Sequence, residues 1–346
     1  SSNMFTIAVA GTHGKTTTAS IIAHILNTAD FSCVAFLGGI VSNFNSNVLL
    51  GKGNMLVVEA DEYDRSFLQL KTDLAVVTFT SPDHLDVYKT EQEFHDAFDD
   101  FIDLIPKGGT VVSSNHAELK VKSGLKHIRY SLAEETHVHS YNLRVEDGGY
   151  QFDLVSPVKN IFGLQFDLGG RHNVENAVAA IFVAQLLGIE EEVIKIAIAS
   201  FAGVKRRFEY VVKNPTCIFI DDYAHHPDEI DACLSSVKEL FPKKKVTVVF
   251  QPHLYSRTRD FADGFGKSLS VADEVLLLDI YPARENPIEG IDSHLIASKI
   301  AHGIVKVFSK KEAIAFLKNN PPELILTLGA GDIDSIVEPI KNNLLS

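Results

Sequence analysis

The fold is decided by the stretch Gly11-Thr12-His13-Gly14-Lys15-Thr16-Thr17-Thr18, which directly follows the apolar run Phe5–Ala10. A short apolar run that ends in glycine is typical of a buried strand, and we expect a helix to begin near Thr16. Glycines here let backbone N–H groups turn inward around phosphate oxygens, and the helix start adds a favourable dipole. Lys15 would supply a positive charge and Thr16 a hydroxyl for Mg²⁺. Val9 stands five positions before Gly14, so the first seven of these residues are predicted to form a shortened variant of the G-x-x-x-x-G-K-[ST] phosphate loop.

Further apolar runs alternate with helix-compatible segments in the first half of the chain. They are Cys33–Leu37, Met55–Glu59, Leu74–Phe79 and Thr110–Ser113. This alternation predicts a mostly parallel sheet covered by helices. From about residue 127 to 168 polar and apolar residues alternate, and Glu146-Asp147-Gly148-Gly149 is a hairpin signal. We therefore expect a small antiparallel extension of the sheet.

A second series of strand-like and helix-like segments fills the rest of the chain. Its strands are expected at Cys217–Asp221, Val246–Phe250, Glu274–Ile280, Lys306–Phe308 and Leu324–Leu328. The sequence thus predicts an α/β protein. Its central P-loop-type domain, residues 1–208, has a mostly parallel sheet with the antiparallel extension, and residues 209–346 form a Rossmann-like α/β domain.

Composition excludes several classes of protein. With 346 residues, 45% of them apolar, the chain can build two domains with real cores. A net charge of −13 argues against nucleic acid as a partner. No run of about 18 uninterrupted apolar residues predicts a membrane span, so we expect a soluble protein. Three cysteines without a C-x-x-C pair suit a reducing cytoplasm.

Further motifs follow the phosphate loop in a fixed order. They are Glu59-Ala60-Asp61-Glu62-Tyr63-Asp64, Asp83-His84-Leu85-Asp86, Gly170-Arg171-His172-Asn173-Val174-Glu175-Asn176, Arg206-Arg207-Phe208-Glu209, Asp221-Asp222-Tyr223-Ala224-His225-His226-Pro227 and Gln251-Pro252-His253-Leu254-Tyr255-Ser256-Arg257-Thr258. In order and spacing these motifs resemble those of the Mur ligases along almost the entire chain. The last three motifs look like the branch that adds L-alanine to UDP-N-acetylmuramate.

The resemblance implies an ATP-dependent, ADP-forming ligase of peptidoglycan precursor synthesis in the bacterial cytoplasm. Such ligases phosphorylate a substrate carboxylate and let an amino-acid amine attack the acyl phosphate. We expect UDP-N-acetylmuramate and L-alanine as substrates, and a monomer or weak homodimer. Two alternatives remain: a recycling ligase that attaches a tripeptide to the same sugar nucleotide, and a nucleotide-binding fragment without turnover.

Two departures from the family pattern, and one difference from some sister ligases that is in keeping with the alanine-adding branch, bear on these expectations. The family normally has a preceding UDP-binding domain, so we expect this chain to be a fragment that binds nucleotide but ligates weakly or not at all. Leu254 stands where many relatives carry arginine, which removes one candidate charge from the substrate cleft. Residues 91–106 contain no lysine, so the carbamoylated lysine of some sister ligases is not expected.

By resemblance, the metal ligands are Thr16, Glu59 and His84. Glu59 ends a predicted strand, and the carboxyl end of a parallel strand is where such a sheet presents ligands. His84 also follows a strand and would reach a second metal ion near the γ phosphate; an imidazole there favours Mn²⁺ over Mg²⁺. Turn capping is the alternative for His84. His13 either contacts phosphate or fills the turn with its ring.

The remaining candidates come from the later motifs, again by resemblance. His172, Asn173 and Asn176 open a helix and would face the adenine, with Asn173 also able to cap. In the second domain, Arg206 would clamp phosphate and Asp222 would bind ribose or orient a neighbour. His226 would contact the amino-acid substrate or the other domain, and Arg257 would neutralise the acyl phosphate or the incoming carboxylate. We expect Lys15, His84, Arg257 and His226 to be catalytic; a zinc site at the His-His pair is rejected, because no further ligand stands at a suitable spacing.

Overall fold

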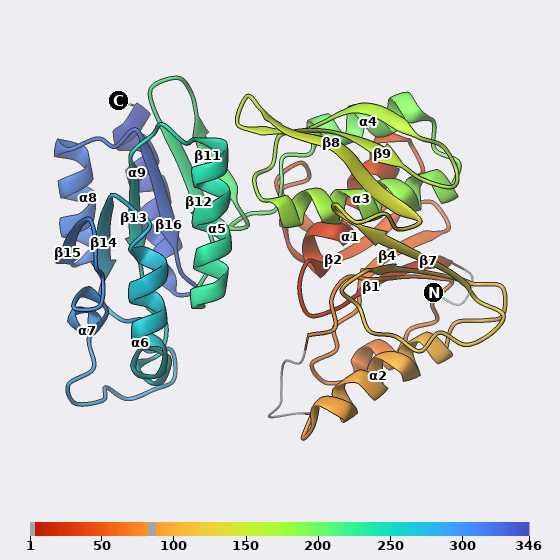
Figure 1. Cartoon of the computed structure of the whole chain (residues 1–346), viewed down its shortest axis with the longest axis horizontal. Coiled ribbons are helices and arrows are strands. Elements are labelled where there is room, and N and C mark those ends of the chain that lie inside the picture. Colours follow the sequence, from red (N-terminus) through yellow and green to blue (C-terminus); the bar gives the residue numbers. More distant parts are fainter. Residues whose placement is uncertain (1–3, 82–87, 346) are drawn as a thin grey trace. The chain divides into compact units, whose positions relative to one another are not determined.

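The structure is a computed structural model that describes residues 4–81 and 88–345 (Figure 1). It divides into two compact units, residues 1–204 and 205–346. The boundary thus lies four residues before the one expected from sequence. The reason is that Phe208 is buried in the second unit and its N–H donates to Asp222 (2.7 Å), while Arg206 accepts the N–H of Tyr223 through its carbonyl (2.7 Å).

The first unit contains a ten-stranded sheet among its described residues, in the order β10-β9-β8-β7-β6-β5-β1-β4-β2-β3. The strands are β1 (Phe5–Ala10), β2 (Val34–Val41), β3 (Ser46–Leu49), β4 (Met55–Glu59), β5 (Leu74–Val77), β6 (Thr110–Ser114), β7 (Lys126–Ser131), β8 (Val138–Glu146), β9 (Gly149–Val155) and β10 (Ile161–Phe166). In this spatial order, every neighbouring pair between β8 and β2 is parallel. The antiparallel pairs are β2 with β3, β8 with β9 and β9 with β10.

The predicted mostly parallel sheet with an antiparallel extension is confirmed, with two differences. Residues 126–131 were expected in the extension, but β7 pairs in parallel with both of its neighbours. The short edge strand β3 was not predicted at all. The hairpin signal is confirmed, because Asp147 and Gly148 both have positive φ angles (49° and 73°) between β8 and β9, which matches the twist of a tight hairpin.

Helices cover both faces of this sheet (Figure 1). The helices α1 (Lys15–Thr28), α3 (Arg171–Leu186) and α4 (Glu191–Ser200) pack against one another on one face. On the other face α2 (Glu91–Asp103) buries Phe94, Phe98 and Phe101 in a core with Phe67 of the 3₁₀ helix η1 (Ser66–Gln69). The phenylalanine spacing of four and three residues places these rings on one side of the helix.

The second unit has a six-stranded sheet among its described residues, in the order β11-β12-β16-β13-β14-β15. The strands are β11 (Glu209–Lys213), β12 (Ile218–Asp222), β13 (Val246–Phe250), β14 (Glu274–Leu278), β15 (Ile304–Phe308) and β16 (Leu324–Leu328). All pairs are parallel except β11 with β12, so the Rossmann-like prediction is confirmed.

The helices of this unit fall into two packed groups. One consists of α5 (Pro227–Leu240), α6 (Tyr255–Leu269) and α7 (Ser293–Ala297), and the other of α8 (Lys310–Asn319), η2 (Asp332–Ile336) and α9 (Val337–Leu345). The neighbouring strands β13 and β16 lead into different groups, α6 and η2 respectively. In open parallel sheets, such a reversal leaves a crevice at the carboxyl ends of the two strands, where ligands bind.

Cys33, Cys217 and Cys233 are free and buried. Within the residues that the structure describes, no helix is long and apolar enough to span a membrane.

Candidate active site

The predicted phosphate loop lies between β1 and α1, and its glycines are required by both backbone and space. Gly14 is the N-cap of α1 with φ 80°, and a Cβ there would lie 2.5 Å from Asn176 Oδ1. Gly11 has φ 129°, and its Cβ would lie 2.2 Å from Thr78 Oγ1. No larger side chain fits either position without displacing a neighbour. The helix begins at Lys15, one residue earlier than expected.

The loop is held by the two residues that follow β5, the strand next to β1. Thr12 N donates to Phe79 O (2.9 Å), and Thr78 Oγ1 donates to His13 O (2.5 Å). The first intrahelical bond runs from Thr18 N to Gly14 O (2.9 Å), so the N–H groups of residues 15–17 have no partner inside the helix. Thr12 Oγ1 is buried and has no hydrogen-bond partner among the described residues. The loop therefore offers polar groups of the kind that a phosphate satisfies.

Lys15 is paired with a carboxylate that the sequence did not single out. Its Nζ donates to both carboxylate oxygens of Glu62, at 2.8 and 2.7 Å. The side chain of Glu62 is fully buried and that of Lys15 is 13% exposed. Burial raises the pKa of Glu62, although the Lys15 ammonium opposes that shift. Glu62 was visible in the acidic run 59–64, but nothing in the sequence shows which of its carboxylates points inward.

Glu59 and Thr16 meet at the carboxyl end of β4, as predicted. Thr16 Oγ1 donates to Glu59 Oε1 (3.0 Å), and Gly38 N donates to the other oxygen (2.7 Å). A Cβ at Gly38 would lie 2.4 Å from that oxygen, so a larger residue there would displace the Glu59 carboxylate. Sequence reasoning missed Gly38; its signal was a glycine pair directly after the predicted strand Cys33–Leu37. His84 lies outside the described residues.

The donor set around Thr16 suits a hard cation. A hydroxyl and a carboxylate oxygen next to a phosphate loop are ligands that Mg²⁺ accepts, with phosphate oxygens and water completing its shell. Among residues 4–81 and 88–345 no three His, Cys, Asp or Glu side chains cluster as a metal site would require. The fit therefore depends on a bound nucleotide supplying oxygens.

The start of α3 lies against the phosphate loop. Asn173 and Asn176 are buried and 3.5 Å apart through their amides, and Asn176 Oδ1 is the atom that excludes a side chain at Gly14. Asn173 does not occupy the cap position, because Gly170 is the N-cap; its amide instead donates to Gly169 O (2.7 Å). His172 is exposed, and its ring crowds the position where a Cβ on Gly170 would stand.

A row of three aromatic rings lies at the same edge of the sheet. Phe79 stacks on His116 with ring centroids 5.1 Å apart and an interplanar angle of 5°, and the His13 ring approaches Phe79 at 6.4 Å. Sequence reasoning missed Phe79 and His116. His13 thus has an aromatic neighbour, in keeping with its ring filling the turn, but it is also exposed.

In the second unit, Arg206 is tied to the loop after β16. It donates to Gly329 O (2.5 Å) and Gly331 O (3.4 Å), and its guanidinium lies 5.0 Å from the centre of the Tyr223 ring. Asp222 accepts the N–H groups of Phe208 (2.7 Å) and Ala224 (2.8 Å), and burial raises its pKa to about 6. These contacts favour the orienting role for Asp222 over direct contact with ribose.

The two histidines after β12 point to different partners. The His226 ring packs on Phe261 (4.7 Å), and the His225 ring packs on Tyr223 (5.3 Å). Glu229 accepts both of their backbone N–H groups (3.1 and 2.9 Å) and so fixes the start of α5. Neither histidine belongs to a cluster of three His, Cys, Asp or Glu side chains among the described residues.

Arg257 lies in the first turn of α6, near two imidazoles. Burial, and after it the Arg257 charge, lower the pKa of His253. Burial and the Arg257 charge also lower the pKa of His225, although the Glu229 charge opposes that shift. Both rings therefore tend to be neutral beside the guanidinium. Arg257 forms no ion pair with any residue that the structure describes, so its charge is available to an anion.

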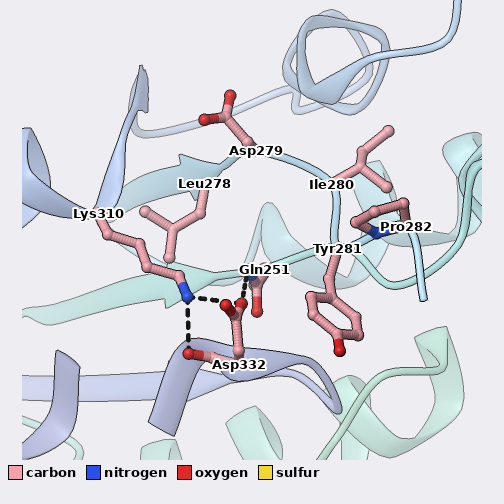
Figure 2. Close-up of a pocket in the computed structure, with 8 residues that line it drawn as sticks. All are labelled: Gln251, Leu278, Asp279, Ile280, Tyr281, Pro282, Lys310 and Asp332. Atoms are coloured by element: carbon pink, nitrogen blue, oxygen red, sulfur yellow. Dashed lines mark hydrogen bonds and ion pairs between the residues drawn. The ribbon is translucent and has the colours of Figure 1, made fainter. Parts of the chain in front are cut away.

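The crevice expected between β13 and β16 is a cavity of about 400 Å³ (Figure 2). Its lining comprises Gln251, Leu278, Asp279, Ile280, Tyr281, Pro282, Lys310 and Asp332. Lys310 Nζ contacts Asp332 at Oδ1 (2.5 Å), and Gln251 Nε2 donates to the same oxygen (2.9 Å). Gln251 is buried, and its Oε1 has no partner among the described residues. Sequence reasoning did not assign Lys310 or Asp279 to a site.

Comparison with known proteins covers both units. The Mur ligase middle domain matches residues 9–184, and the glutamate ligase domain of Mur ligases matches residues 206–331. The UDP-N-acetylmuramate–L-alanine ligase of Cytophaga hutchinsonii is 45% identical over 341 residues, which cover 97% of this chain and 73% of that protein. The enzyme of the same name from Flavobacterium psychrophilum is 46% identical, with 98% and 75% covered.

Solved structures give the same result for the fold. UDP-N-acetylmuramate-alanine ligase MurC from Thermotoga maritima aligns with a TM-score of 0.82 at 27% identity, covering 99% of this chain and 76% of that one. A murein peptide ligase from Psychrobacter arcticus aligns with a TM-score of 0.63 at 22% identity, covering 99% and 78%. At that identity the second likeness concerns the fold alone.

Proposed function

The chain belongs to the Mur ligase family, and from that premise we propose that it acts as an ATP-dependent, ADP-forming ligase that joins L-alanine to the carboxylate of UDP-N-acetylmuramate. The reaction has two steps. A carboxylate oxygen attacks the γ phosphorus and ADP leaves; then the alanine amine attacks the acyl carbon and phosphate leaves. The single observation that carries the proposal is the phosphate loop with Lys15 and the Thr16–Glu59 pair beside it.

The first unit would bind the nucleotide. The N–H groups at the start of α1 face the phosphates, and the Lys15 ammonium adds a fixed charge next to them. Thr16 and Glu59 would hold Mg²⁺, which neutralises phosphate charge when bound. Asn173 and Asn176 adjoin Gly14, so we assign to them, with His172, the adenosine part of ATP. His84 keeps its proposed role at a second metal, for which Mn²⁺ is also suitable.

The second unit would supply the amino acid and part of the charge neutralisation. We assign L-alanine to the cavity at β13 and β16, because Gln251 Oε1 lacks a donor that an ammonium group would provide. Lys310 lines the same cavity, but its ammonium already contacts Asp332 and Ser335. Arg257 would stabilise the acyl phosphate, and His226 would contact the substrate beside it. Arg206 would reach phosphate in addition to its contacts with the 329–331 loop.

We also propose a cellular compartment and an oligomeric state for this protein. The reaction would take place in the bacterial cytoplasm, where ATP is available, and the protein would act as a monomer or weak homodimer. No nucleic acid or membrane takes part.

Measurement of ADP release tests the function. When the chain is joined to the UDP-binding domain that the family normally has, and ATP, Mg²⁺ and UDP-N-acetylmuramate are present, we expect L-alanine to stimulate ADP release and a murein tripeptide not to. Lys15→Ala should lower the affinity for ATP at least tenfold, measured by calorimetry, because a charge-assisted contact to phosphate is lost. The exposed Lys52→Ala is the matched control and should bind ATP as the wild type does.

Each negative result has a defined meaning. Stimulation by the tripeptide alone would replace the alanine-adding assignment with the recycling activity. ATP bound at unchanged affinity by Lys15→Ala would remove the phosphate loop from the proposal. Binding of ATP without ADP release under any condition would leave the nucleotide-binding alternative.

A further inference from the structure

The contact between Lys15 and Glu62 uses most of the donors of the ammonium group. A lysine ammonium has three N–H donors. Two of them point to the two oxygens of Glu62, at 2.8 and 2.7 Å. One N–H remains for a phosphate oxygen, and its direction is set by the other two. This bidentate contact fixes a side chain that would otherwise have four rotatable bonds.

Glu62 is itself held firmly by its backbone. Its carbonyl accepts the N–H of Arg65 (3.0 Å) and the hydroxyl of Tyr88, which is fully buried. Two residues earlier, Ala60 N donates to Val9 O (2.8 Å), which ties the segment to β1. The backbone that carries the carboxylate is therefore anchored, and only rotation of the Glu62 side chain would let the carboxylate follow Lys15 toward a ligand.

Movement of Lys15 away from Glu62 would leave this carboxylate without its ion-pair partner. The side chain of Glu62 is 0% exposed with Lys15 in place, so a carboxylate that lost the ammonium would depend on water entering the vacated space. Removing one partner of a buried ion pair is far more destabilising than replacing both. Breaking the contact with Glu62 is therefore costly, and Lys15 is expected to keep it when nucleotide binds and to reach phosphate through its third donor.

We propose that Glu62 is a positioning residue that holds the Lys15 ammonium in place for phosphoryl transfer and stays bonded to it in the nucleotide complex. The inference rests on the proposed function only in taking the ligand to be ATP. It has a consequence for charge: the pair is neutral as a whole, so the phosphate charge is met mainly by the helix start and by the metal ion. The opposite mechanism is a competing carboxylate, which phosphate would have to displace from Lys15.

The pairing is tested first on the nucleotide-free protein. Lys15→Ala leaves Glu62 buried and unpaired, and we expect its unfolding midpoint to fall by roughly 10 °C. Adding Glu62→Gln to this variant should recover at least half of that loss, since the neutral amide is cheaper to bury. Asp64→Asn, in the same loop but exposed and bonded to Ser66, is the control and should give no recovery. Additive losses in the double variant would overturn the pairing.

The positioning role is tested on the complex with a non-hydrolysable ATP analogue and Mg²⁺. A crystal structure should show Lys15 Nζ within hydrogen-bond distance of both Glu62 and a phosphate oxygen. A lysine bonded to phosphate alone would establish competition and overturn the proposal. In the ligase assay, Glu62→Gln should lower kcat roughly tenfold or more while the KM for ATP changes less than threefold, because misplacement acts on the transition state.

The outcomes separate this inference from the proposed function. A lower KM for ATP with unchanged kcat in Glu62→Gln would mean that the Glu62 carboxylate competes with phosphate for Lys15, and it would overturn the proposal. If the protein binds no ATP, the proposed function fails, whereas the stability measurements on the nucleotide-free protein still decide whether the two side chains act as a pair. Glu62→Asp, which keeps the charge on a shorter side chain, should recover more kcat than Glu62→Gln if orientation and charge both matter.

Discussion

Gly14 is the residue at which the phosphate loop packs closely against Asn176 of α3. Its φ of 80° costs any L side chain about 1 kcal/mol or more, and the Asn176 amide occupies the place of a Cβ. The same atom that excludes a side chain belongs to the pair we assign to adenosine. Strain and crowding therefore act at this position together, and they can be separated by comparison with a glycine that has strain alone.

Gly14→Ala should lose affinity for ATP at least tenfold and lower the free energy of unfolding by about 2 kcal/mol, because Asn176 must move as the backbone strains. Gly188→Ala is the control: its φ is 75° and nothing lies within 4 Å of the added carbon. It should show the backbone cost of about 1 kcal/mol and normal ATP binding. Equal ATP affinities in the two variants would show that crowding at Asn176 has no role in the site.

At the scale of elements, the carboxyl ends of strands account for most of what could be predicted. The apolar run before Gly11 and the run before Glu59 place both at one edge of a parallel sheet, which is why Thr16 and Glu59 meet as expected. The partners of these residues could not be predicted. Glu62 faces Lys15 and Gly38 faces Glu59 because β1 lies beside β4 and β4 beside β2, an order that no local pattern encodes.

The same limit applies to β12 and β16, which are far apart in sequence and paired in space. Asp221 at the end of β12 accepts the Thr327 hydroxyl of β16 (2.5 Å) and lies 3.7 Å from Arg206 Nε. Burial raises its pKa from 3.8 to about 6, despite these contacts. The sequence shows two adjacent aspartates but not that one is enclosed between strands.

This shift predicts a pH dependence with a definite sign. The pKa of Asp221 is higher in the folded than in the unfolded state, so between about pH 4 and 6 the folded state binds more protons. Its contribution to stability therefore falls as the pH rises through this window and is constant above it. We expect the wild type to gain about 1 kcal/mol relative to Asp221→Asn on going from pH 7 to pH 5, measured by urea unfolding. An unchanged difference between the two proteins would contradict the shift, because groups that do not interact with Asp221 contribute equally to both proteins and cancel.

At the scale of the molecule, the division into two units carries a prediction about their independence. Each unit has its own buried core, built around Phe94, Phe98 and Phe101 in the first and around Phe219, Val249 and Ile325 in the second. A unit with its own core is expected to fold alone. We expect residues 205–346, expressed separately, to unfold cooperatively on heating.

The same experiment distinguishes the structural boundary from the one expected from the sequence. A fragment that starts at residue 209 lacks Phe208, whose side chain is 1% exposed, and Arg206, whose guanidinium binds the loop after β16. Losing a buried phenylalanine alone costs about 3–5 kcal/mol, so its midpoint should lie about 10 °C or more below that of residues 205–346. Phe208→Leu in the longer fragment retains most of the buried volume and should fall between the two. Identical midpoints for both fragments would mean that residues 205–208 do not stabilise the second unit. The contacts of Phe208 with Asp222 and of Arg206 with Gly329 would then not be needed to keep the strand ends of that sheet in place.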